Sequence, residues 1–239
     1  MNPFIQHGTV VLVHGAWADG SCWSNVILPL RRQGLSVMCA QIPLTSLTDD
    51  IAALNRAVER TSGPVTLVGH AYSGAVIAGT TEERVKALVY IAALAPDEGE
   101  TVADGFYRGD PHPQAPHLAP DAHGFIWMPE EGFGQAVAHK ASSDQATIMA
   151  AVQRPIAQKC IQEKAPAPAW RTKPSWFLIA EEDRMISPET QRFMAHRMGA
   201  IARAREVDHS PMLTEPALVI DVILEAVRQS VSPAAVSRS

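Results

Sequence analysis

The chain has 239 residues, of which 46% are hydrophobic, and this is enough to build one domain with a sizeable buried core. The formal net charge is −5, and the 20 lysines and arginines are scattered along the sequence. These features argue against a basic surface for nucleic acid or an anionic membrane. They favour a small, uncharged or weakly charged ligand as the partner.

Cysteine usage and apolar runs indicate the compartment. Cys22, Cys39 and Cys160 are odd in number and lack CxxC spacing, so the sequence suggests neither a disulfide framework nor a zinc site. Residues 1–8 lack the basic and apolar segments of an export signal, and no apolar run reaches the roughly 18 residues that a membrane span requires. We therefore expect a protein of the reducing cytoplasm.

Six short segments have the composition of β-strands: residues 9–13, 35–40, 65–68, 85–91, 175–180 and 202–207. All but the last are largely apolar without strict alternation, as parallel strands buried on both faces should be. The last is half charged and fits an edge position. Segments with helical spacing alternate with the strands, at residues 22–33, 47–61, 71–80, 188–198 and 211–229. This alternation predicts an α/β domain with about six mainly parallel strands and helices on both faces.

Residues 97–172 break this alternation. The stretch 110–123 is crowded with proline, histidine and aspartate, and residues 131–164 have helical spacing that Pro155 interrupts. We predict that residues 97–172 form a helical cap inserted over the carboxyl edge of the sheet. Residues 1–96 and 173–239 then form the core.

The segment after the third predicted strand has the pattern of a nucleophile elbow centred on residue 71. This turn needs small residues two positions before and two after the nucleophile, because it brings backbone segments into contact. Gly69 and Ser73 meet that need. Residue 71 is therefore the position of a catalytic serine, but the chain carries alanine there. Ala71 lacks the oxygen that would attack a carbonyl group.

Two residues complete the chain order of a triad of nucleophile, acid and base. Asp183 follows the strand at 175–180, where it would orient the histidine, and Glu181 and Glu182 are alternative acids. His209 follows the last strand and is the expected general base. The residue after the nucleophile, Tyr72, would supply one backbone N–H group of an oxyanion hole.

The sequences around His14-Gly15, the elbow, Glu182-Asp183-Arg184 and Asp208-His209 resemble the α/β-hydrolase superfamily over nearly the whole chain except the cap. The resemblance is strongest to a small esterase branch with plant methylesterases, hydroxynitrile lyases and bacterial carboxylesterases. It implies an α/β-hydrolase fold and a cofactor-free carboxylic-ester hydrolase that works through an acyl-enzyme, with Ala71, Asp183 and His209 at the triad positions. It also implies Ala16 as the second oxyanion donor. A related lactonase or C–C hydrolase is an alternative.

Three rival interpretations stay open. Hydroxynitrile lyases, as the resemblance implies, carry threonine and lysine where this chain has Val11 and Ser210, which favours ester hydrolysis here. A natural pseudoenzyme that only binds a small molecule fits Ala71, but the retained acid and base favour a deliberate replacement of serine. Ser73 is a third possibility, as the nucleophile of a shifted elbow, although its hydroxyl would point away from the site.

The substrate pocket has less pattern in the sequence. We expect a small apolar ester to bind there, against walls that include Trp17, Phe106, Phe125 and Trp127. We expect His14 and His70 to make structural hydrogen bonds. His112, His117 and His123 match no compact ligand spacing, so no metal site is predicted. The sequence does not specify an oligomeric state.

Overall fold

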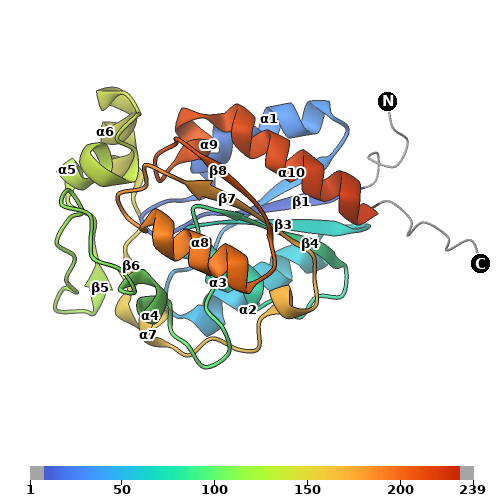
Figure 1. Ribbon diagram of the computed structural model, residues 1–239, viewed down its shortest axis with the longest axis horizontal. Coiled ribbons are helices and arrows are strands. Elements are labelled where there is room, and N and C mark those ends of the chain that lie inside the picture. Colours follow the sequence, from blue (N-terminus) through green and yellow to red (C-terminus); the bar gives the residue numbers. More distant parts are fainter. Residues whose placement is uncertain (1–7, 232–239) are drawn as a thin grey trace, which may run out of the picture.

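A six-stranded sheet forms the centre of the molecule in the computed structural model, which describes residues 8–231 (Figure 1). The strand order is β2-β1-β3-β4-β7-β8, and all neighbours pair in parallel. The strands are β1 (Thr9–Val13), β2 (Ser36–Ala40), β3 (Val65–His70), β4 (Val85–Ile91), β7 (Ser175–Ala180) and β8 (Ile201–Arg205). The predicted fold class is confirmed.

The central strands are apolar on both sides because helices cover both faces of the sheet. In β1, Val11 and Val13 face one apolar cluster, whereas Val10 and Leu12 face the other. This arrangement explains why the buried strands lack alternation in the sequence. The edge strand β8 is mostly exposed, which agrees with its charged composition.

Two helical layers enclose the sheet (Figure 1). One face is covered by α1 (Ser24–Arg32) and α10 (Pro216–Val231), and the other by α2 (Leu47–Glu59), α3 (Ser73–Ala78) and α8 (Pro188–Arg197). The single helix predicted for residues 211–229 is wrong. A short helix, α9 (Pro211–Thr214), ends before α10 begins, because Pro216 lacks the amide hydrogen that a continuous helix needs.

Residues 97–172 contain short helices and one small sheet. The elements are α4 (Val102–Phe106), β5 (Phe125–Ile126), α5 (Glu130–Gly132), a π-helical turn (Phe133–Val137), α6 (Ser143–Val152), β6 (Ile156–Ala157), α7 (Gln158–Gln162) and a 3-10 turn (Ala169–Arg171). The sequence suggested no strand here, but β5 and β6 pair antiparallel with each other and stay outside the central sheet. We call this pair the cap ribbon. The division of the chain into core and cap stays a prediction.

Within residues 8–231, no helix is both long enough and apolar enough to cross a membrane. The prediction that the chain lacks an export signal rests on residues 1–8. Of these, residues 1–7 lie outside the described residues.

Candidate active site

Ala71 lies in the sharp turn between β3 and α3. Its φ of +52° is in the left-handed region, which residues other than glycine rarely adopt and which often marks a functional turn. Its N–H group donates to the Ile91 carbonyl at 3.2 Å, and its carbonyl accepts from the Leu94 N–H at 3.0 Å. A Cβ atom at Gly69 would lie 2.8 Å from the Ser73 carbonyl oxygen. The turn therefore has the strained, closely packed geometry that a nucleophile elbow requires.

Ser73 fastens this turn from inside. Its hydroxyl oxygen accepts from the His70 N–H at 2.9 Å and lies 2.8 Å from the Val13 carbonyl oxygen. The side chain is completely buried and does not line the cavity beside Ala71. Because its hydroxyl is occupied by backbone groups, Ser73 is poorly placed to attack a substrate.

Asp183 and His209 form a buried hydrogen-bonded pair. The distance from His209 Nδ1 to Asp183 Oδ2 is 2.8 Å, and both side chains are almost fully buried. Since a carboxylate can only accept, Nδ1 carries the proton and Nε2 keeps a lone pair. Among the described residues, no group forms a hydrogen bond with that Nε2 atom. The Nε2 atom, whose ring lines the same cavity as Ala71, is therefore the atom placed to exchange a proton with a group bound there.

The two alternative acids lie elsewhere. Glu181 forms an ion pair with Arg192, and Glu182 forms one with Lys140 at 2.8 Å. Neither contacts His209. Of the three neighbouring acids, only Asp183 is at hydrogen-bond distance from the base.

Gln191 from α8 also holds Asp183, a contact that we did not anticipate from the sequence. Its Nε2 donates to Asp183 Oδ2 at 2.7 Å and to the Ile186 carbonyl at 2.9 Å, while its Oε1 accepts from the Ala180 N–H at 2.9 Å. The Met185 and Ile186 N–H groups donate to the other Asp183 oxygen. The acid is fully hydrogen-bonded, so its orientation toward His209 is fixed.

The two expected oxyanion donors are unoccupied. Within residues 8–231, neither the Ala16 nor the Tyr72 N–H group donates to a protein acceptor. The loop that carries Ala16 lies close to the elbow, because a Cβ atom at Gly15 would be 3.1 Å from Ala71 Cβ. Two free backbone N–H groups beside residue 71 are what stabilisation of an oxyanion needs.

A buried carboxylate anchors Tyr72. The Asp50 Oδ2 atom accepts from the Tyr72 hydroxyl at 2.6 Å, and Oδ1 accepts from the Leu44 N–H at 2.7 Å. Cys160 of α7 lies 3.7 Å from the same Oδ2. Burial raises the pKa of Asp50 to about 6, although these hydrogen bonds oppose the rise. Asp50 thereby joins α2, the elbow and the cap.

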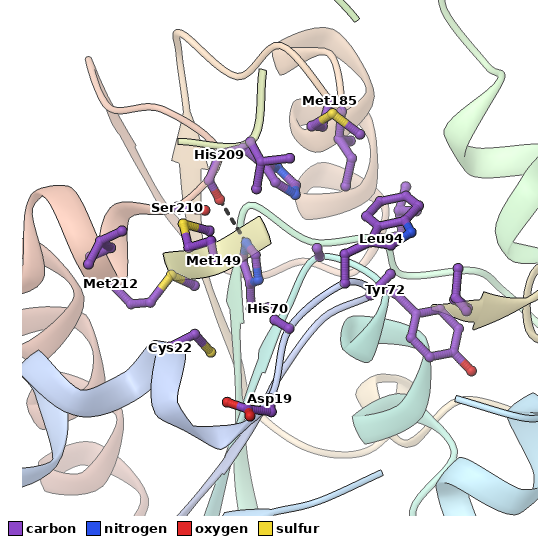
Figure 2. A pocket seen from close by; sticks show the side chains of 18 of the residues that line it. Asp19, Cys22, His70, Tyr72, Leu94, Met149, Met185, His209, Ser210 and Met212 are labelled. Carbon is purple, nitrogen blue, oxygen red and sulfur yellow. Dashed lines mark hydrogen bonds between the residues drawn. The ribbon is translucent and has the colours of Figure 1, made fainter. Parts of the chain in front are cut away.

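His14 and His70 make hydrogen bonds to the backbone. His14 Nδ1 donates to the Gly15 carbonyl at 2.9 Å, and its Nε2 accepts from the Ile42 N–H at 3.3 Å. His70 Nε2 donates to the His209 carbonyl at 2.7 Å (Figure 2). Burial lowers the pKa of His14 to about 4 and holds that of His70 well below its usual value. Both rings are therefore neutral supports of the loops around the site.

A cavity of about 390 Å³ opens beside these groups. In Figure 2, His70 and His209 lie near its middle, with Leu94 and Met185 toward one side and Cys22 toward the other. No lysine or arginine of the described chain lines it, and the only carboxylate among the described lining residues is that of Asp19. Apolar residues that were not predicted as pocket walls contribute much of the lining: Leu118, Ile126, Ile148, Met149, Val152, Ile156, Ile161, Met212 and Leu213.

Two of the four residues predicted for the pocket wall line the cavity. These are Trp17 and Phe106, whereas Phe125 and Trp127 do not line it. Ile126 of β5 lines the cavity instead, which fits the alternation of side chains along a strand. Trp127 is 50% exposed.

The end of the polar loop at 110–123 is stabilised by local hydrogen bonds to Asp121. Asp121 accepts from the backbone N–H groups of His123 and Phe125 and from the Trp127 indole. In the part of the chain that the structure describes, no group of three or more histidine, cysteine, aspartate or glutamate side chains is arranged to hold a metal ion.

Comparisons with known proteins find esterases similar to this chain in sequence and in fold. Methylesterase 2 of Arabidopsis thaliana is 24% identical over 90% of this chain and 94% of its own length. A carbendazim hydrolyzing esterase of Nocardioides sp. is 30% identical, but the match covers only 38% of this chain and 44% of that esterase. The crystal structure of polyneuridine aldehyde esterase superposes with a TM-score of 0.80, covering 92% of this chain and 99% of that one at 17% identity, which shows a shared fold.

A family model described as the alpha/beta hydrolase family matches residues 10–222. This match spans most of the chain, including both sides of the elbow and the loop of His209. The resemblance seen in the sequence is confirmed: the chain belongs to the alpha/beta hydrolase family.

Proposed function

We propose that this chain is a carboxylic-ester hydrolase whose nucleophile position is filled by Ala71, so that the sequence as it stands binds an ester without hydrolysing it. The observation that carries the proposal is the pairing of His209 with Asp183 beside a strained elbow at residue 71. The free N–H groups of Ala16 and Tyr72 support it. Only the attacking oxygen is missing.

With a serine at position 71, the geometry supports acyl transfer. His209 Nε2 would take the hydroxyl proton as the serine oxygen attacks the ester carbonyl, and Asp183 would stabilise the imidazolium that forms. The Ala16 and Tyr72 N–H groups would hold the oxyanion. Collapse of the tetrahedral intermediate would release the alcohol, which takes the proton from His209. Water would then hydrolyse the acyl-enzyme by the same steps.

The lining of the cavity favours a small, neutral, apolar ester. Without lysine or arginine in the wall, a carboxylate or phosphate on the substrate would lose its hydration and find no opposite charge. Apolar side chains from both the core and the cap would contact the acyl and alcohol parts. The names of the relatives, a methylesterase and two other esterases, support this substrate class.

The proposal includes a cytoplasmic location. All three cysteines are free, which suits a reducing compartment. Alkylation under denaturing conditions during cell lysis, followed by recovery of the chain and mass spectrometry, would test this, and we expect all three thiols to be modified because the denaturant exposes the buried Cys160.

Restoring serine tests the proposal. We expect Ala71→Ser to hydrolyse p-nitrophenyl esters at least about a thousandfold faster than the Ala71 chain, because loss of a triad member typically removes several orders of magnitude in rate. A panel of chain lengths, methyl esters and lactones would define the substrate. The matched control is Ala71→Ser combined with His209→Ala. Equal, high activity with alanine and serine would overturn the assignment of residue 71.

Ala71 itself favours one alternative function. A natural pseudoenzyme would use the same cavity to bind a small molecule. Folded Ala71→Ser protein that hydrolyses no member of the panel, while the Ala71 chain binds its ligand tightly, would support this binding module. The native codon at position 71 would show whether the alanine is original.

A further inference from the structure

Two loops at the carboxyl edge of the sheet contain strained residues that are not glycine. Trp17 follows β1 with a φ of +56°, and Leu44 follows β2 with a φ of +60°. For a bulky side chain this conformation is an outlier, and it persists only when surrounding contacts impose it. The question is which contacts impose it here.

The contacts of Trp17 come from the cap. Its backbone N–H donates to the Arg154 carbonyl at 3.1 Å, and its indole Nε1 donates to the Ile126 carbonyl at 2.9 Å. Ile126 belongs to β5 and pairs with Ile156 of β6, two residues after Arg154. The indole donor of Trp17 is therefore bound by the cap ribbon, and its backbone donor is bound by the segment that leads directly into β6 (Figure 1).

The same ribbon also holds Leu44. The Ala157 N–H of β6 donates to the Leu44 carbonyl at 2.9 Å, and the Leu44 N–H is held by Asp50. The cap ribbon thus contacts both strained loops at the carboxyl edge of the sheet. Its position and the conformation of these loops depend on each other.

The Trp17 contact bears directly on the oxyanion hole. The peptide unit between Ala16 and Trp17 is planar, so binding of the Trp17 N–H to Arg154 fixes that plane and constrains Ala16. The Trp17 N–H is used by the cap, whereas the Ala16 N–H has no protein acceptor in the described chain. The Trp17 N–H therefore fastens the loop to the cap, and the Ala16 N–H stays available to bind the oxyanion of the proposed reaction.

We propose that Trp17 is a positioning residue that fastens the oxyanion loop to the cap ribbon, so that the cap takes part in assembling the catalytic site. This inference rests on the proposed function, since Trp17 acts through the Ala16 N–H. The proposed role differs from that of a residue that only forms the cavity wall. A wall would change substrate affinity, whereas a fastener would change the rate of the chemical step.

The kinetic test uses the Ala71→Ser background and replaces the indole by a smaller aromatic ring that has no N–H group, while the backbone N–H of residue 17 stays. We expect Trp17→Phe to lower kcat about tenfold or more with KM changed less than about threefold, because a misplaced oxyanion donor weakens transition-state binding. Trp127→Phe is the matched control, since its indole donates to Asp121 outside the cavity. Unchanged kcat in Trp17→Phe, or an effect on KM alone, would overturn the proposal.

A rescue variant sharpens this test. Trp17→His keeps a ring N–H at a position similar to that of the indole N–H, on a smaller ring. We expect a higher kcat than for Trp17→Phe, together with a higher KM because the apolar wall shrinks. A kcat no higher than that of Trp17→Phe would contradict a role for the hydrogen bond to Ile126.

A measurement on the Ala71 chain keeps this inference separate from the proposed function. Amide hydrogen exchange reports local opening without any catalysis. In Trp17→Phe we expect about tenfold faster exchange at residue 17 and at Ala157, with α10 unchanged. Unchanged exchange at both amides would overturn the fastening role even if Ala71→Ser is active. Faster exchange alongside an inert Ala71→Ser protein would refute the proposed function and leave the fastening intact.

Discussion

The core wall and the cap wall of the cavity differ in how firmly they are held. The core wall carries Ala71, Tyr72 and His209, all nearly buried, and the elbow is held by backbone hydrogen bonds and close backbone packing. The cap wall includes α6, in which no residue is buried, and Ile148 there is 62% exposed. The contrast indicates that the proposed catalytic residues lie on the more firmly held wall, whereas the exposed side chains of α6 have fewer contacts to hold them.

The largest expected effects concern the acid and base of the core wall. In the Ala71→Ser background, we expect His209→Ala to lower kcat by roughly three to four orders of magnitude, since the hydroxyl then has no base. Asp183→Asn should cost a similar amount by allowing the wrong imidazole tautomer. Steady-state kinetics with one p-nitrophenyl ester would measure both. A loss below tenfold in either variant would contradict these roles.

Alanine substitutions at two glycines, one in the core and one in the cap, would compare how tightly the two regions are packed. A Cβ atom at Gly74, behind the elbow, would lie 2.2 Å from the Leu94 carbonyl oxygen, whereas one at Gly134 in the cap would lie 3.8 Å from Ala146 Cβ. We expect Gly74→Ala to lower the free energy of unfolding by about 3 kcal/mol or more. Gly134→Ala should change it by less than about 1 kcal/mol. Urea denaturation of both variants measures the change in the free energy of unfolding. Equal losses in the two variants would contradict the tighter packing of the core wall.

Asp50 lies where the core meets the cap, and its ionisation should make the free energy of unfolding depend on pH. Its pKa in the folded protein is about 6, above the usual 3.8, so its proton stabilises the fold below pH 3.8 and this contribution is lost as the pH rises through 6. The difference corresponds to about 3 kcal/mol. We expect the stability of Asp50→Asn relative to the unaltered chain to increase by about 2–3 kcal/mol between pH 4 and 8. A pH-independent difference in urea unfolding would refute this.

The smallest expected effect on stability is in α6. Ile148→Ser replaces an exposed side chain, so the free energy of unfolding should change by less than about 0.5 kcal/mol. Ile148 also lines the cavity, and in the Ala71→Ser background KM for long-chain esters should rise severalfold. Ile201→Ser, at an exposed position away from the cavity, is the matched control. A large loss of stability would show that α6 is packed more firmly than its exposure indicates.

The same contrast explains what the sequence could predict. The buried strands and the elbow were recognisable because burial on both faces and close backbone contact restrict which residues fit. The cap ribbon was missed because its two-residue strands have no periodicity and lie about thirty residues apart. Asp50 and Gln191 were also missed, since a polar residue on a helix is usually exposed, and only the tertiary structure shows that these two are buried beside the site.

The most direct test of the central claim is covalent labelling of residue 71. A fluorophosphonate reacts with a hydroxyl activated by a neighbouring base and an oxyanion hole, and intact-protein mass spectrometry detects the adduct. We predict that Ala71→Ser gains one phosphonyl group, that adding His209→Ala abolishes the gain, and that the Ala71 chain gains none. Equal labelling of the Ala71 chain, or a folded Ala71→Ser protein that stays unlabelled, would contradict an intact site that lacks only its attacking oxygen.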